Sequence, residues 1–171
     1  YSTVSHLGLI TFLIGLSTPL SMVVAVFHIL NHAAFKAALF MSAGIVDHEA
    51  HTRDLRKLGG LMALMPVMGT LVLIAAAAMA GIAPLNGFIS KEMMLDEAVR
   101  AGNRMWGSFG WLVPVLATTG GLFSAAYSIR LVHDAFFNGP PRDLAGAHPH
   151  EPPWGMKAPV VLLVAICIGV G

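Results

Sequence analysis

The sequence has 171 residues, of which 56% are hydrophobic and 11% are charged, and its net charge at pH 7 is +1. Soluble proteins average about 45–50% apolar and about 25% charged residues. The composition therefore excludes a disordered chain, a nucleic-acid-binding domain and an ordinary water-soluble fold, and it predicts a protein surrounded by lipid. The single cysteine, Cys167, excludes a disulfide framework and a cysteine-based metal cluster.

Apolar runs long enough to approach or cross a bilayer recur along the chain. A membrane core of about 30 Å requires roughly 20 mostly apolar residues per helix. Four spans are predicted, at residues 4–16, 20–46, 61–82 and 106–137, and residues 158–171 begin a further helix. Because the chain starts without methionine and stops inside this last run, we expect a fragment of a longer protein, with residues 1–171 forming a single transmembrane domain.

The polar connections predict how the helices are oriented in the membrane. Lysine and arginine gather in residues 47–60 and 138–157, whereas Arg100 and Arg104 belong to the opposite side if residues 61–99 cross the membrane once. Short loops rich in lysine and arginine remain in the cytoplasm. The sequence therefore predicts a cytoplasmic loop at residues 47–60.

Residues 61–99 allow two interpretations. Either residues 61–82 span alone and residues 88–99 form a second helix, or the whole stretch is one helix broken near Pro84, Asn86 and Gly87. Residues 88–99 carry several charges and extend only about 18 Å at 1.5 Å per residue, too short to cross. Proline removes a backbone donor and glycine adds conformational freedom, so we favour one discontinuous helix. In lipid such a break is tolerated only against protein or a water-filled cavity.

His28, His32 and Lys36 recur every four residues within the second predicted span. Each step of four residues advances a helix face by only about 40°, so the three side chains share one stripe, with Asn31 close by. One interpretation is a polar patch that joins helices through hydrogen bonds. Three ionisable groups in register inside one span favour a proton path instead, because histidine titrates near neutral pH and a desolvated lysine releases its proton more readily.

Lys91 and Glu92 follow the predicted break directly. Broken helices hold ions in transporters, which favours a functional role, although charges here could also reach into water at the membrane surface. Ser5 is an accessory candidate, because Ser2, Thr3, Ser5 and His6 could bind water along a channel. Glu92 and Asn31 are further accessory candidates.

The sequence contains no pattern typical of a conventional enzyme site. A phosphate-binding loop, a dinucleotide glycine fingerprint, a nucleophile elbow and a CxxC motif are absent, and the loop histidines form no compact metal-ligand pattern. We therefore expect no enzyme active site, no cofactor and no metal in this sequence.

Four segments resemble the antiporter-like subunits shared by respiratory complex I and the multisubunit cation/proton antiporters of the Mrp type. The segments are YSTVSHLG at residues 1–8, HILNHAAFKA at 28–37, KLGGL at 57–61 and GFISKE at 87–92. They follow one another in family order and cover most of residues 1–137. The segment HEPPWGMK at residues 150–157 is more similar to the A-type subunit of Mrp antiporters than to subunit 5 of complex I.

The resemblance implies an all-α, polytopic transmembrane helix bundle with one discontinuous helix, part of a fold built from two inverted repeats. It implies that this chain supplies most of the second repeat, that His28, His32 and Lys36 line a polar chain, and that Lys91 is its terminal proton carrier. The glutamate and lysine that the family pairs in the first repeat lie outside the sequence.

At the level of function, the resemblance implies a proton-translocating subunit of a Na⁺(K⁺)/H⁺ antiporter in a bacterial cell membrane, assembled with other antiporter subunits. The alternative is an antiporter-like subunit of complex I, part of an NADH:quinone oxidoreductase. A third hypothesis is a scaffold for membrane assembly that transports nothing and uses the polar stripe only to join helices.

Overall fold

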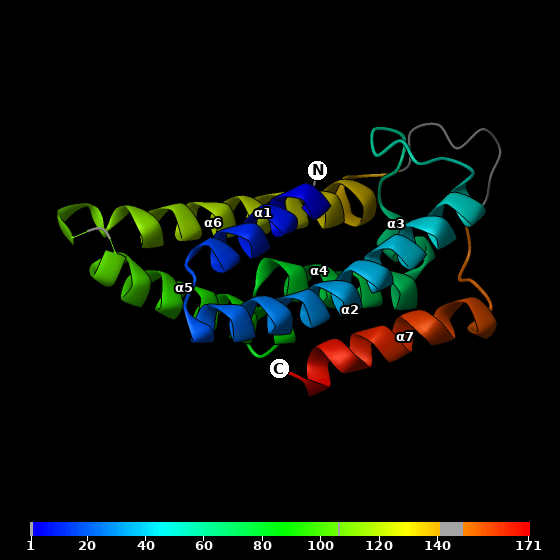
Figure 1. Ribbon diagram of the computed structural model, residues 1–171. Helices are drawn as coiled ribbons and strands as arrows, with labels where there is room; N and C mark the ends of the chain where they lie inside the picture. Colours follow the sequence, from blue (N-terminus) through cyan, green and yellow to red (C-terminus); the bar gives the residue numbers. More distant parts are fainter. Residues whose placement is uncertain (1, 106, 141–148) are drawn as a thin grey trace.

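The computed structural model describes residues 2–105, 107–140 and 149–171, and all regular secondary structure in these ranges is helical (Figure 1). This confirms the predicted all-α class. Seven α-helices follow one another: α1 (Ser2–Gly15), α2 (Pro19–Ala50), α3 (Leu61–Leu64), α4 (Pro66–Ala80), α5 (Asn86–Met105), α6 (Leu112–Val132) and α7 (Trp154–Gly169). A 3-10 turn, Gly107–Phe109, precedes α6, and a π-helical turn, His133–Phe137, extends it.

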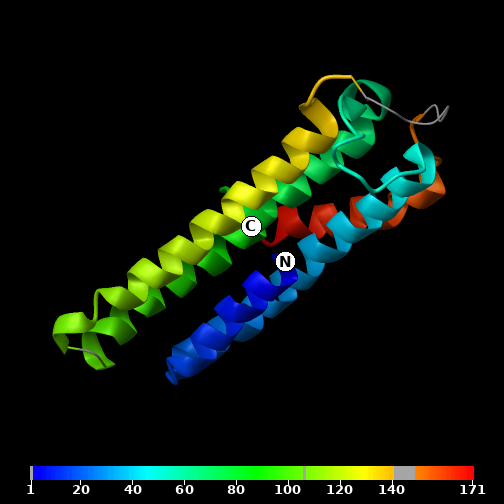
Figure 2. The same cartoon turned by 90° about the horizontal axis from the view of Figure 1, so that it is seen from above.

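The helices lie side by side in an elongated bundle (Figures 1 and 2). Two stretches, Pro19–Ala50 and Gly107–Phe137, are long and apolar enough to cross a membrane. The segments 51–60 and 138–140 meet at one end of the bundle, and the turns at 16–18 and 107–111 lie at the other. The predicted loop 138–157 therefore shares an end with residues 51–60, although residues 141–148 of it lie outside the described ranges.

Helices α4 and α5 follow one another in the same direction and run alongside α2 (Figure 2). Both pack against α2 and against α6. Helix α4 ends at Gly81, whose φ of 85° is the left-handed conformation that glycine adopts without strain. The interruption at residues 81–85 thus coincides with the break expected near Pro84.

Several helix bounds differ from the sequence-based ones. Helix α5 has 20 residues, Asn86–Met105, and not the expected 12, because Met94, Ala98 and Ala101 form an apolar face buried against the bundle. A second interruption divides the predicted span 61–82 at Met65. The following Pro66 disfavours a helical conformation for Met65, which has φ −134°.

The remaining differences lie at helix ends. Helix α2 continues to Ala50, four residues past the expected end, and stops at His51 in the left-handed conformation. Helix α6 begins at Leu112, and Trp106, the expected start, lies outside the described residues. Helix α7 begins at Trp154, earlier than the expected 158, because Pro153 is extended and ends the preceding loop.

The buried apolar side chains form two clusters, separated by a polar layer. One cluster joins α1, the first part of α2, α5 and the start of α6, and includes Val24 and Ala25. The other joins the second part of α2 to α4 and α7, and includes Phe35. Between them on α2 lie His28 and Asn31, both buried. The core is therefore interrupted at mid-bundle by groups that need hydrogen-bond partners.

The half-buried carboxylate of Glu151 joins two helices at the end of the bundle that carries residues 51–60. Glu151 accepts hydrogen bonds from the backbone N–H groups of Val67 and Met68, both at 3.2 Å, and its Oε1 lies 3.3 Å from Lys157 Nζ. A carboxylate in this position satisfies free N–H groups at the start of α4 and complements the helix dipole. The contact ties the segment before α7 to α4.

Candidate proton-transfer site

The polar stripe on α2 faces the interior over only part of its length. His28 is fully buried, whereas His32 and Lys36 are half-buried. The Nζ atom of Lys36 lies 5.1 Å from the ring centroid of Phe40, one turn further along the helix. The stripe therefore begins in the protein interior at His28 and reaches a more open environment at Lys36.

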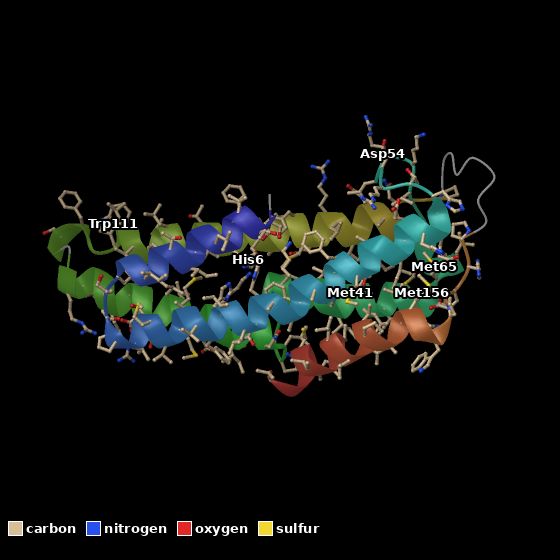
Figure 3. The ribbon with its side chains drawn as sticks, turned by 45° about the vertical axis from the view of Figure 1, so that its right-hand side comes forward. His6, Met41, Asp54, Met65, Trp111 and Met156 are labelled. Carbon is tan, nitrogen blue, oxygen red and sulfur yellow. The ribbon has the colours of Figure 1, made fainter. Side chains whose placement is uncertain are left out.

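A third histidine, from α1, joins the two on α2. Figure 3 shows His6 in the interior of the bundle, and its side chain is fully buried. His6 Nδ1 lies 3.1 Å from His28 Nε2, and the His6 ring centroid lies 5.0 Å from that of His32. We call His6, His28 and His32 the histidine cluster. It places three titratable rings at the point where α1 crosses α2.

The Lys91 ammonium lies at the end of α4. Its Nζ donates to the carbonyl oxygens of Met79 and Ala80, both at 2.9 Å, and to Ser124 Oγ on α6 at 3.1 Å. We call these three oxygen atoms the Lys91 cradle. The last carbonyl groups of a helix have no intrahelical partner and carry the negative end of its dipole, so they stabilise a positive charge.

Two glycines at the break allow the close contacts that the Lys91 cradle needs. Gly81 leaves space for the Lys91 side chain, because a Cβ at Gly81 would lie 2.7 Å from Lys91 Cδ. Gly87 packs against the backbone of α4, and a Cβ there would overlap the carbonyl oxygen of Ala78. Asn86 is buried and bonds to α2, whereas Pro84 lies at the exposed turn.

Side chains from α5 and α6 complete the site. Ser90 Oγ lies 3.0 Å from His28 Nδ1, and Ser124 Oγ lies 3.4 Å from His6 Nε2. The Tyr127 hydroxyl donates to Ser124 Oγ at 3.2 Å. Ser124 therefore contacts Lys91 and His6, so that described hydrogen bonds connect the Lys91 cradle to the histidine cluster.

Lys36 approaches this network through a cavity. The cavity has a volume of about 410 Å³, and its lining includes Lys36 from α2, Met79 from α4 and Tyr127 from α6. Lys36 and Tyr127 thus line the same cavity, and the Tyr127 hydroxyl bonds to Ser124, which contacts Lys91.

Among the ten predicted site residues, the structure brings together His28, His32 and Lys91, and the buried pair formed by Asn31 and Asn86. Ser5 is half-buried on α1, and Glu92 is exposed on α5. Sequence reasoning missed Ser90, Ser124 and Tyr127. Ser124 and Ser128, both buried, are four residues apart on α6, and this small polar pair in an apolar helix is a signal that could have drawn attention to the site.

Comparison with known proteins assigns this architecture to a family. Residues 1–117 match the family described as NADH:quinone oxidoreductase/Mrp antiporter, TM. The chain is 53% identical over 171 residues to the probable K(+)/H(+) antiporter A/B subunit of Rhizobium meliloti (strain 1021), with 100% of this chain and 17% of that protein covered. It is 40% identical over 185 residues to the Na(+)/H(+) antiporter A-type subunit of Bacillus subtilis (strain 168), with 98% of this chain and 23% of that protein covered.

Solved structures share the same arrangement of helices. The Mrp complex from Dietzia sp. DQ12-45-1b contains a chain that is 37% identical and superposes with a TM-score of 0.82, over 100% of this chain and 18% of that chain. The membrane-bound sulfane sulfur reductase, an archaeal respiratory membrane complex, superposes with a TM-score of 0.78 at 23% identity, over 90% of this chain and 24% of its own, and shows a likeness of fold.

These comparisons confirm the predicted resemblance to the A-type subunit of Mrp antiporters. The chain spans about a fifth of the length of the curated relatives it matches. Its apolar helices and the family match identify a multi-pass membrane protein. The chain belongs to the NADH:quinone oxidoreductase/Mrp antiporter transmembrane family and is homologous to a section of the A-type antiporter subunits.

Proposed function

We propose that this chain forms part of the proton-conducting pathway of a multisubunit Na⁺(K⁺)/H⁺ antiporter. The observation that carries the proposal is the half-buried Lys91 ammonium at the interruption between α4 and α5, joined through Ser124 to the histidine cluster. A lysine held inside a membrane protein is expensive and marks a path for ions or protons. The names of the relatives, K(+)/H(+) and Na(+)/H(+) antiporter subunits, agree with cation/proton exchange.

In the proposed mechanism, Lys36 and Lys91 alternate between charged and neutral states. His28 and His32 lie between them and carry protons with the help of water. The interruption at residues 81–85 makes α4 and α5 two halves of one discontinuous helix, and the carbonyl groups it frees stabilise the Lys91 ammonium. Transfer of a proton from Lys91 through Ser124 weakens the attraction of the lysine to these carbonyl groups.

The proposal includes a setting for the chain. It supplies most of the second repeat of an inverted-repeat antiporter fold, in the cell membrane of a bacterium, in contact with other subunits of the antiporter. Residues 47–60 face the cytoplasm. The clustering of Arg53, Arg56 and Lys57 at one end of the bundle, opposite Arg100 and Arg104, supports this orientation.

The test is Lys36→Ala and Lys91→Ala in the complete antiporter, assayed as proton flux driven by Na⁺ or K⁺ in membrane vesicles. Both variants are expected to abolish cation-dependent flux. Arg104→Ala removes an exposed cation from the end of α5 and serves as the control, with flux expected near the wild-type rate. Wild-type flux in both lysine variants, at normal amounts of assembled complex, contradicts the proposal and favours the scaffold hypothesis.

A further inference from the structure

His6 occupies the centre of the histidine cluster. Its ring centroid lies 5.3 Å from that of His28 and 5.0 Å from that of His32, whereas the His28 and His32 rings are 6.4 Å apart. The stripe on α2 therefore lacks a close contact between its own two histidines. The ring from α1 is nearer to each of them than they are to one another.

The hydrogen bonds around His28 allow one arrangement of protons that links it to His6. The Ser90 hydroxyl is in position to donate to the Gly87 carbonyl at 3.2 Å, and Ser90 Oγ then accepts from His28 Nδ1 at 3.0 Å. A neutral imidazole carries one N–H, so His28 Nε2 is an acceptor in this arrangement. His6 Nδ1 then donates to His28 Nε2 across 3.1 Å.

The same rule applies to the far side of His6. When its Nδ1 carries the proton, as in this arrangement, its Nε2 is an acceptor, and this atom lies 3.4 Å from Ser124 Oγ. Ser124 accepts a hydrogen bond from the Lys91 ammonium at 3.1 Å and donates to the Met79 carbonyl oxygen at 3.2 Å. Rotation of the hydroxyl about its Cβ–Oγ bond turns the same hydrogen toward His6. The vacant lone pair of His6 thus faces the one side-chain hydroxyl group in the Lys91 cradle.

His32 lies beside His6 and one helical turn before Lys36 on α2. Its Nε2 atom is buried and, among the described residues, has no hydrogen-bond partner. Buried polar atoms are nearly always satisfied, and this ring nitrogen, beside two other imidazoles, has the capacity for a further hydrogen bond. The His6 ring lies 5.0 Å from the His32 ring, centroid to centroid, and its Nε2 lies 3.4 Å from Ser124 Oγ.

We propose that His6 is a proton carrier at the junction between the Lys91 cradle and the stripe on α2, an inference that rests on the proposed function. A proton leaves Lys91 Nζ for Ser124 Oγ while the Ser124 hydroxyl proton passes to His6 Nε2. The resulting imidazolium releases its Nδ1 proton to His28 Nε2. Lys91 ends neutral and His28 ends charged, every N–H bond that breaks is matched by one that forms, and no redox partner is needed.

The experiment compares His6→Gln, Ser124→Ala and the control His133→Gln in the complete antiporter. Glutamine can donate and accept hydrogen bonds but does not titrate near neutral pH. His133 has a side chain that is 61% exposed and serves as a matched loss of one histidine. Cation-dependent proton flux is expected to fall at least about tenfold in His6→Gln, with an unchanged KM for the cation, and to remain at the wild-type rate in His133→Gln.

Infrared difference spectroscopy on ring-labelled histidine provides a second readout that a structural role would not produce. Addition of Na⁺ or K⁺ is expected to change the imidazole bands of the wild-type complex and of His133→Gln. The change should be lost in His6→Gln and in Ser124→Ala, because the latter separates Lys91 from His6. The serine variant also decides the question if His6→Gln does not assemble.

Three outcomes overturn the inference. The first is wild-type flux in His6→Gln while Lys91→Ala is inactive. The second is an unchanged histidine signal in an inactive His6→Gln, which assigns His6 to structure alone, and the third is a full signal in Ser124→Ala. Failure of the proposed function looks different, because Lys36→Ala and Lys91→Ala then both retain flux.

Discussion

Asn31 and Asn86 bond to each other across the interface between α2 and the start of α5. Asn31 Nδ2 donates to the backbone oxygen of Asn86 at 3.2 Å, and Asn86 Nδ2 donates to Asn31 Oδ1 at 3.3 Å. Both side chains are buried, with exposed fractions of 3% and 0%. The pair fixes the first turn of α5 against α2, one helical turn from His28 and five residues before Lys91.

Asn31→Ala is expected to destabilise the bundle by about 0.5–2 kcal/mol, because it removes both hydrogen bonds and leaves the Asn86 side chain buried without this partner. Thermal unfolding of the purified complex checks this as a lower midpoint. Asn103→Ala, at an exposed position on α5, is the control and should leave the midpoint unchanged. Equal midpoints for the two variants would show that the pair contributes nothing.

Gly87→Ala is expected to disturb the start of α5. The added Cβ overlaps the carbonyl oxygen of Ala78, and backbone cannot move aside as a flexible side chain can. Overpacking of this kind costs about 1–3 kcal/mol, and it displaces the turn that brings Lys91 to its cradle. Thermal unfolding and cation-dependent proton flux should both be reduced.

Gly44→Ala is the matched control for this prediction. Gly44 lies within α2, and a Cβ at this position meets no atom within 4 Å. Alanine favours a helix over glycine by about 1 kcal/mol, so stability should be unchanged or slightly higher. If Gly87→Ala behaves like Gly44→Ala, the close approach of α5 to α4 is unimportant for the site.

Thr18 connects two features at the other end of the bundle. Its hydroxyl oxygen accepts from the Ser21 backbone N–H at 3.0 Å and so caps α2, and the same hydroxyl donates to the carboxylate of Glu97 on α5. Glu97 is only 1% exposed, and a buried carboxylate needs such a donor. Thr18 thus stabilises the start of α2 and satisfies a buried carboxyl group on α5 at the same time.

Thr18→Val should therefore destabilise the protein by more than the loss of a helix cap, which costs about 0.5–2 kcal/mol. Thr18→Ser retains the hydroxyl group and should remain within about 0.5 kcal/mol of the wild type. Thermal unfolding of the purified complex compares the two variants. The prediction is contradicted if valine is tolerated as well as serine.

The spacing of His28, His32 and Lys36 was enough to predict a shared helix face, because an α-helix returns nearly to the same side every four residues. Length and proline were enough to predict an interruption near Pro84, since residues 88–99 are too short to cross alone. The residues at which the helices begin and end were less predictable. Helix α5 extends to Met105 because its apolar face finds partners in other helices, which no local pattern reveals.

By itself the sequence determined that the chain lies in lipid and that it is helical, and it predicted that its few interior charges mark the functional region. These properties follow from composition and local periodicity, because a bilayer penalises every unpaired polar group. Only the tertiary structure decided that His6, from α1, is the ring between His28 and His32, and that Ser124, from α6, contacts Lys91. Residues 118 positions apart meet because helix packing brings them together, and proton transfer depends on such distances and not on position in the sequence.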